Sequence, residues 1–194
     1  MNHMYRWTRH VYDASRRYYL LGRDHLIENL HPEKKQIICE IGCGTARNLI
    51  KMAKRYPDCR FFGIDVSDEM LKTAQASIQR AGVKIEVAQG QAESFDPAKT
   101  FNLKEPFDKV VFSYTLAIIP TWKESIDNAL HILKSGGELH IIDFGDQKNL
   151  SPAFRKFLFG WLEKFHVYHK PAIAAYLKQL ESQQKGHLFF EALY

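Results

Sequence analysis

The chain has 194 residues, of which 45% are hydrophobic and 25% charged, and its formal net charge at pH 7 is +5. This length and composition fit one globular domain that can form a core without disulfides or metal, with a modest extra element at either end. No apolar run approaches the roughly 20 residues that cross a bilayer, and the first residues lack the apolar stretch of a secretory signal.

The first 30 residues have a helical pattern with a break at Gly22, and we expect them to form a helical cap over a site in the domain that follows, residues 31–194. In that domain, short apolar runs alternate with helical patterns. Strands are predicted at Ile37–Ile41, Arg60–Asp65, Lys84–Ala88, Asp108–Ser113 and Gly137–Asp143, and helices at Asn48–Tyr56, Glu69–Ala81 and Trp122–Leu133. Apolar strands separated by helices indicate a doubly wound α/β fold, a parallel sheet with helices on both faces.

The last part of the chain predicts helices at Pro152–Phe165 and Pro171–Gln183 and a strand at His187–Tyr194. The first of these helices carries basic residues on either side of an apolar stripe. The stripe consists of Phe154, Phe157, Leu158, Trp161, Leu162 and Phe165. Core packing is the commoner reason for such a stripe. An interfacial helix is the alternative, so that the segment 152–185 would face membrane or lipid.

A glycine turn follows the first predicted strand, in the run Glu40-Ile41-Gly42-Cys43-Gly44-Thr45-Ala46. Glycine tolerates positive φ and lets the backbone approach a ligand closely. An acid, Asp65, ends the next strand about 20 residues later, where a carboxylate can accept both ribose hydroxyls. The order strand, glycine turn, helix, strand and acid therefore predicts a nucleoside site.

This corner resembles the first two motifs of the class I S-adenosylmethionine-dependent methyltransferases, whose fold is Rossmann-like. The runs 88–93 and 133–139 resemble the loop that edges the adenine and the turn into the fifth strand. Ala46 stands where dinucleotide folds have a third glycine, and Gln91 where the family usually has Asp. The resemblance implies S-adenosylmethionine as cofactor, with contacts from Tyr19, Arg23, Glu40, Gly42, Cys43, Gly44, Asp65, Val66, Met70, Gln91, Ala92 and Ser113.

The sulfonium of that cofactor already activates the methyl group, so the protein mainly has to align a nucleophile. We expect Ser113 and Tyr114, at the end of the fourth strand, to line the reacting position. Tyr114, Asp143 and His166 are the candidate catalytic residues, each able to accept a proton or bond the acceptor.

The sequence lacks the Asn/Asp-Pro-Pro-Tyr/Phe run of methyltransferases that act on nucleobase amines, so nucleic acid is not an expected substrate. No metal site is expected, because the three cysteines include no CxxC pair. Their odd count also argues against disulfides and indicates a reducing, cytoplasmic compartment. Tyr12, Arg16, Tyr19 and Arg23 share one helical face, and we expect Tyr12 and Arg16, with Asp146, to contact the substrate.

A narrower resemblance covers both flanks: the runs 12–23, 142–147, 154–155 and 161–167 are similar to the betaine-lipid N-methyltransferases. Those enzymes methylate the homoserine amine of diacylglyceryl-homoserine three times. The resemblance implies a peripheral protein at the inner membrane surface, with anionic lipid and the enzyme that makes diacylglyceryl-homoserine as partners. A methyltransferase for another lipid or a soluble small-molecule amine, and a non-catalytic cofactor-binding or RNA-associated module, are the alternatives.

Overall fold

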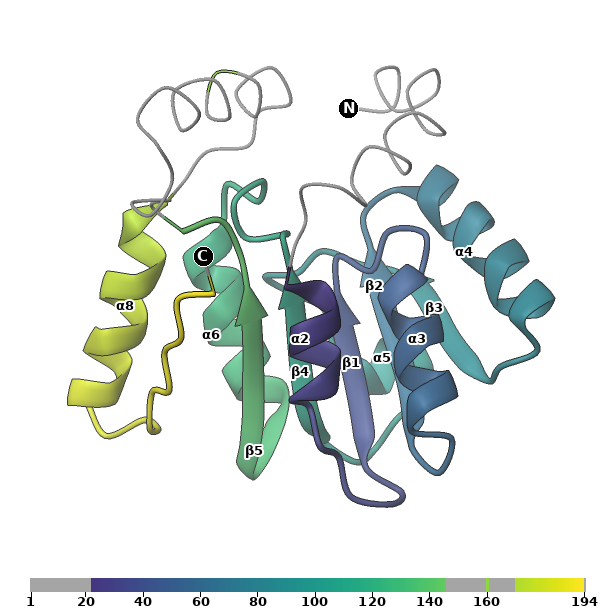
Figure 1. The fold of residues 1–194 in the computed structure, drawn as a ribbon, viewed down its shortest axis with the longest axis horizontal. Helices are drawn as coiled ribbons and strands as arrows, with labels where there is room; N and C mark the ends of the chain where they lie inside the picture. Colours follow the sequence, from purple (N-terminus) through teal and green to yellow (C-terminus); the bar gives the residue numbers. More distant parts are fainter. Residues whose placement is uncertain (1–21, 146–159, 161–169, 194) are drawn as a thin grey trace.

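Five strands form one parallel sheet with the first strand at its centre. The computed structural model describes residues 22–145, 160 and 170–193. The strands are β1 (Ile37–Ile41), β2 (Arg60–Asp65), β3 (Ile85–Gln89), β4 (Phe107–Ser113) and β5 (Leu133–Ile142), in the order β3-β2-β1-β4-β5 (Figure 1). The chain moves outward from β1 to β3 and then returns to the other side of β1. This reversal places a crevice at the carboxyl ends of β1 and β4, where such sheets bind ligands.

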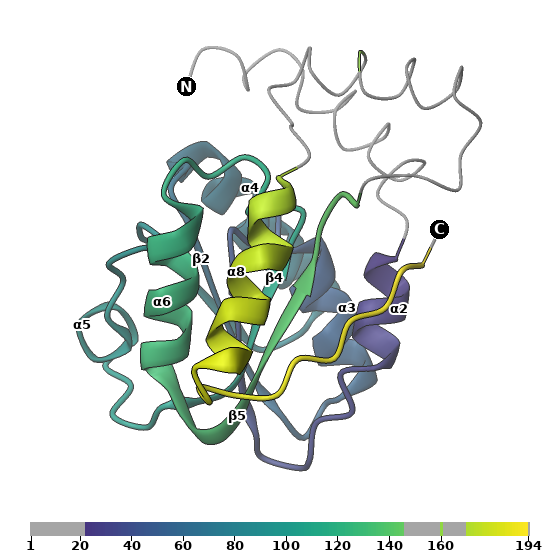
Figure 2. The same cartoon turned by 90° about the vertical axis from the view of Figure 1, so that its left-hand side faces the viewer.

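The described helices cover both faces of the sheet, as the edge-on view shows (Figure 2). One face is covered by α2 (Arg23–Glu28), α3 (Arg47–Arg55) and α4 (Asp68–Ala81), and the other by α5 (Pro97–Phe101), α6 (Trp122–Ile132) and α8 (Pro171–Ser182). Each face has its own core of buried apolar side chains, with β1 buried along its whole length between them. The prediction of a doubly wound α/β fold is therefore confirmed.

Close packing of α3 on the sheet fixes the turn that precedes this helix. Gly63 of β2 lies under α3, where a Cβ atom would come within 2.6 Å of the Leu49 side chain and 2.9 Å of Cys43. A side chain at position 63 would push the helix away, so glycine sets the helix–strand distance. The backbone N–H groups of Gly42 and Cys43 both donate to the Ile64 carbonyl, at 2.8 and 2.9 Å, which ties the turn to β2.

The predicted strand at the end of the chain is wrong for the described residues 187–193, which form no strand. The Leu188 N–H donates to the Glu181 side chain at 2.7 Å, and Phe189 and Phe190, although consecutive, are 89% and 68% exposed. A strand needs one buried face, and this segment has none over these residues. It runs past β5 towards α2 instead, where Glu191 lies 2.9 Å from His25 (Figure 2).

The other predicted elements agree more closely with the structure or lie outside the described residues. The expected break at Gly22 matches the start of α2, for which Gly22 has a φ of 89°. The helix α5 was not predicted, although Asp96 and Pro97 are typical of a helix start, and Asp96 accepts the Ala98 N–H at 2.9 Å. The cap before Gly22 lies outside the described residues, and so does the predicted helix Pro152–Phe165 except for Gly160, which is helical and exposed. Among the helices that are described, none is long and apolar enough to cross a membrane.

Candidate functional site

A cavity of about 840 Å³ lies at the carboxyl ends of β1, β2 and β4. Its volume is in the range of small-molecule sites. The structure brings the following sequence-predicted residues into its lining: Arg23, Glu40, Gly42, Cys43, Gly44, Asp65, Val66, Met70, Gln91, Ala92, Ser113 and Tyr114. Tyr12, Arg16, Tyr19, Asp146 and His166 lie outside the described residues, so their roles stay predictions.

The β1–α3 turn needs its two glycines for different reasons. Gly42 has a φ of 74°, and a Cβ atom there would overlap the Thr115 side chain. Gly44 has a φ of 54°, and a Cβ atom there would meet no protein atom within 4 Å. The backbone of Gly44 is therefore bare on the side of the cavity, where a ligand can approach it closely. Ala46, with a φ of 61°, is the N-cap residue directly before α3.

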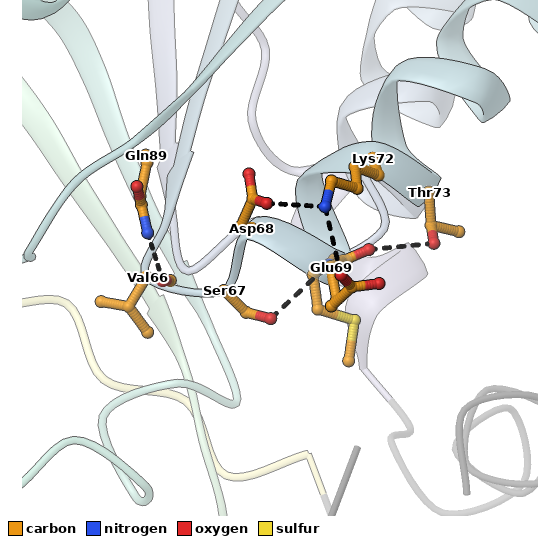
Figure 3. Close-up of polar contacts among 8 residues, drawn as sticks. Val66, Ser67, Asp68, Glu69, Lys72, Thr73 and Gln89 are labelled. Atoms are coloured by element: carbon orange, nitrogen blue, oxygen red, sulfur yellow. Dashed lines mark hydrogen bonds and ion pairs between the residues drawn. The ribbon is translucent and has the colours of Figure 1, made fainter. Parts of the chain in front are cut away.

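The β2–α4 turn holds Asp65 and Val66 at the cavity wall. The two carboxylate oxygens of Asp65 accept the N–H groups of Gly44 at 2.8 Å and Ser67 at 2.9 Å. The Gln89 side chain donates to the Val66 carbonyl at 3.0 Å, and Ser67 caps α4 (Figure 3). Val66 is 57% exposed although it is apolar. The turn thus presents a fixed carboxylate beside an open apolar surface, which suits a ribose and a flat base.

Glu40 is a buried carboxylate with one oxygen in use. It is 2% exposed, and Asn48 donates to its Oε1 at 2.8 Å. Its Oε2 has no hydrogen-bond partner among the described residues. Burial raises the pKa of Glu40 from its ordinary value of 4.5 to about 7, against the opposing effects of the Asn48 bond and the Arg23 charge. An unpartnered oxygen in a cavity wall is a strong acceptor for a cationic or N–H donor group.

Backbone strain marks the end of β4. Tyr114 has a φ of 55°, which is uncommon for a residue with a bulky side chain. Its N–H donates to the Ile142 carbonyl at 2.8 Å, and its ring packs 4.8 Å from Phe144 and 5.6 Å from the Arg23 guanidinium. The hydroxyl of the preceding Ser113 is buried in the cavity wall and has no partner in the part of the chain that is described. Strain and an unsatisfied hydroxyl at one point are typical of a functional site.

Comparison with known proteins gives the family. The model of the methyltransferase domain family matches residues 32–187, which is most of the chain. The chain belongs to the methyltransferase domain family. It is 24% identical over 172 residues to demethylmenaquinone methyltransferase of Listeria welshimeri, a match that covers 87% of this chain and 66% of that enzyme.

Two further matches extend this result. The chain is 26% identical over 124 residues to an uncharacterized protein of Methanocaldococcus jannaschii, which covers 64% of this chain and 32% of that protein. It therefore spans less than two thirds of either curated relative. The YcgJ protein of Bacillus subtilis has a similar fold, with a TM-score of 0.64 at 18% identity over 84% of this chain and 67% of that chain.

The cofactor that this methyltransferase fold implies is S-adenosylmethionine, and the cavity fits it. Asp65 suits the ribose hydroxyls, while Val66 with Gln91 and Ala92 would border the adenine. The open Oε2 of Glu40 would accept from the ammonium of the methionine part, and the Arg23 guanidinium would be placed to pair with its carboxylate. Among the described residues, no group of three or more His, Cys, Asp or Glu side chains is placed to hold a metal ion.

Asp143, another predicted catalytic residue, lies just after β5 and does not line the cavity as Tyr114 does. Its carboxylate accepts the N–H groups of Ala117 at 2.9 Å and Phe144 at 2.8 Å, and it is not among the described residues that line the cavity. Its proposed part in proton transfer stays a prediction.

Asn48, whose side chain donates a hydrogen bond to Glu40, was not identified from the sequence. The pattern that could have revealed it is a polar residue on the buried face of α3, next to Leu49 and Met52.

Proposed function

We propose that this methyltransferase uses S-adenosylmethionine to methylate an amine, and that the amine is the homoserine head group of diacylglyceryl-homoserine, which it trimethylates. The observation that carries the methyl transfer is the cavity itself, with Asp65 and the open oxygen of Glu40 on its β1–β2 side and Ser113 on its β4 side. Bound there, S-adenosylmethionine would supply a methyl group already activated by its sulfonium.

The groups around the cavity favour an acceptor that needs no strong base. No histidine is present among the described lining residues, and Lys51 is paired with Asp24 at 2.6 Å. The two carboxylates on the β1–β2 side are held by Asn48 and by backbone amides. A homoserine α-amine titrates near pH 8, so about a tenth is neutral at pH 7, at a cost of about 1.4 kcal/mol. Alignment of such an amine can supply several kcal/mol, which outweighs that cost.

The lipid part of the proposal is supported by the sequence, because the runs 12–23 and 142–147 resemble the betaine-lipid N-methyltransferases. The formal net charge of +5 also favours an anionic membrane surface as the place of work. A second candidate acceptor is demethylmenaquinone, since the enzyme of that name matches 87% of this chain.

A methylation assay tests the proposal. The full chain is incubated with S-adenosylmethionine and diacylglyceryl-homoserine in mixed micelles, and lipid products are followed by mass spectrometry. We expect successive increments of one methyl group, up to three. Parallel reactions contain demethylmenaquinone or free homoserine. Increments only on the quinone would support the second candidate, and increments only on free homoserine would support a soluble amine substrate.

Cofactor binding by calorimetry accompanies each reaction. Intact cofactor binding with no transfer to any of the three acceptors would contradict an enzymatic role and favour a non-catalytic cofactor-binding module. Sedimentation with vesicles tests the membrane surface separately. We expect binding to vesicles that contain anionic lipid and weaker binding as salt rises; failure to bind at low salt would contradict a peripheral location.

A further inference from the structure

The loop between β4 and α6 forms the cavity wall on the side of β4. Of its residues, Tyr114, Thr115, Ile118, Ile119, Pro120 and Thr121 line the cavity. Most of the groups that fit the cofactor lie on the other side, at the ends of β1, β2 and β3; Arg23 of α2 is the exception, with its guanidinium 5.6 Å from the Tyr114 ring. An acceptor that approaches from the β4 side would contact the 114–121 loop, and the shape of this loop would then affect which acceptors fit.

Two charged side chains from distant parts of the chain hold this loop by its backbone. Lys170, just before α8, donates from Nζ to the carbonyls of Leu116 at 3.0 Å and Ile119 at 2.7 Å. Asp143, just after β5, accepts the N–H of Ala117 at 2.9 Å. Three backbone groups within four consecutive residues are thus held by side chains of opposite charge. Bonds in which one partner is ionised are the stronger class of hydrogen bond.

The two side chains also act on each other. Partial burial lowers the pKa of Lys170, while the charge of Asp143 opposes that effect and favours the ammonium form. Asp143 therefore both holds the Ala117 amide and supports the charge on the lysine that holds the neighbouring carbonyls.

The loop has a conformation that needs such support. It begins at Tyr114, whose φ of 55° is costly for a tyrosine, and continues with bonds from the Ile118 and Ile119 N–H groups to the Thr115 carbonyl at 3.0 and 3.1 Å. Strained backbone persists only where the surroundings over-determine it. Without the outside contacts, the loop can relax toward other backbone conformations, and the wall that faces the acceptor would change shape.

We propose that Lys170 and Asp143 are positioning residues that lock the 114–121 loop in the conformation that binds the methyl acceptor. For Asp143, this role is distinct from the predicted part in proton transfer. The inference rests on the proposed function for the identity of the acceptor, whereas the locking of the loop is measurable without any turnover.

The first test is hydrogen exchange of the full, cofactor-free chain. In Lys170→Met, which keeps the stem of the side chain and removes its charge, the peptide that covers residues 114–121 should exchange faster, while peptides of β1 and α3 are unchanged. Lys170→Arg should restore slow exchange, because a guanidinium can also donate to two carbonyls. The matched control is Lys178→Met, a change at an exposed lysine of α8 that should leave the loop as it is.

The second test separates acceptor from cofactor. With diacylglyceryl-homoserine in micelles, Lys170→Met should raise the KM of the acceptor about tenfold while the Kd of S-adenosylmethionine changes by about twofold or less. Lys170→Arg should recover most of the loss. An equal loss of affinity for cofactor and acceptor would overturn the positioning role, because it would mean general damage to the site.

The two tests distinguish failure of the proposed function from failure of the proposed loop locking. If the lipid is not methylated by the wild-type chain, the proposed function fails, and the exchange of residues 114–121 still decides the locking. Unchanged exchange in Lys170→Met would overturn the locking whatever the acceptor is. Should Lys170→Met not fold, Asp143→Leu is measured instead. It keeps the approximate shape of the side chain and removes both acceptor oxygens, and unchanged loop exchange in that variant would overturn the inference in the same way.

Discussion

Replacing Glu40 with glutamine is expected to stabilise the cofactor-free protein at alkaline pH and to weaken cofactor binding. Glu40 is 2% exposed, and its Oε2 has no hydrogen-bond partner among the described residues. A glutamine keeps an oxygen for the Asn48 donor, which lies 2.8 Å from Oε1, and carries no charge that needs solvation. The variant therefore removes the cost of the buried charge while preserving the shape of the site.

The size of the effect follows from the pKa. Burial raises the pKa of Glu40 from 4.5 to about 7, a difference that corresponds to about 3 kcal/mol. Between these two values the folded protein holds a proton that the unfolded chain has lost. The free energy of unfolding of the wild type therefore falls as the pH rises from about 4.5 to 7 and stays low above that. The glutamine variant lacks this loss, so its advantage is small below about pH 5 and reaches about 3 kcal/mol at pH 8.

The assay is urea denaturation of both proteins without cofactor, at matched ionic strength from pH 5 to pH 8. Glu105→Gln is the control, because Glu105 is an exposed carboxylate paired with Arg60. That variant should show no comparable dependence on pH. If the advantage of Glu40→Gln at pH 8 does not exceed its advantage at pH 5, the pKa of Glu40 is not raised, and the reasoning from burial is refuted.

The same variant tests the assignment of Glu40 to the methionine part of the cofactor. In calorimetry, Glu40→Gln should raise the Kd of S-adenosylmethionine about tenfold, since a bond to a charged group is lost. The Kd of methylthioadenosine, which lacks the amino acid part, should not change. For the wild type, the affinity for S-adenosylmethionine should fall as the pH drops below about 7, because Glu40 must then lose a proton to bind the ammonium. Equal losses for the two ligands would contradict this placement.

Three further changes test the remaining parts of the site. Asp65→Ala should raise the Kd of S-adenosylmethionine by about tenfold to a hundredfold in calorimetry, through loss of the ribose bonds, and unchanged affinity would contradict the placement of the ribose. Gly44→Val should abolish cofactor binding; its control is Gly82→Val, where φ is also positive at 66° and no atom lies within 4 Å of a Cβ, so equal strain without loss of binding is expected. Arg23→Ala should lower turnover and leave the thermal midpoint nearly unchanged. It should also raise the pKa of Glu40 further, since the Arg23 charge lowers that pKa. The control is Arg55→Ala, which removes a guanidinium 5.8 Å from the Tyr56 ring, and a similar loss of turnover there would show a non-specific effect.

The sequence predicts well those strands and turns whose structure depends on residues close together in the chain. The apolar runs at Ile37–Ile41 and Arg60–Asp65 match β1 and β2, because a strand buried on both faces is nearly continuously apolar. The cofactor corner was also predicted, since the glycine turn and Asp65 lie within one strand–helix–strand unit. The strand predicted at His187–Tyr194 was wrong over residues 187–193, because a local apolar run does not show whether a segment pairs with the sheet. The Leu188 N–H donates to the Glu181 side chain, and Phe189 and Phe190 are both exposed.

Contacts between distant parts of the chain were not predictable from local patterns. Lys170 lies 54 and 51 residues from the two carbonyls that it bonds, and nothing around it in the sequence indicates them. Asp143 was predicted as a catalytic candidate at the end of the fifth strand. It does lie just after β5, but only the structure shows that its carboxylate accepts the Ala117 N–H. A pattern thus identifies which residue types stand at the ends of strands, whereas the fold decides which backbone groups they reach.

The division of the site explains how one fold can serve different acceptors. Apart from Arg23 of α2, the groups that fit the cofactor come from the ends of β1, β2 and β3, where backbone amides hold Asp65 and Gly63 allows close helix packing. The acceptor wall is a loop held by two side chains from later elements, Asp143 and Lys170. Changes in the loop or its two supports can therefore alter the acceptor without disturbing the cofactor. The acceptor is thus to be sought in residues 114–121 and in the side chains that hold them, and exchange of that loop is the measurement closest to it.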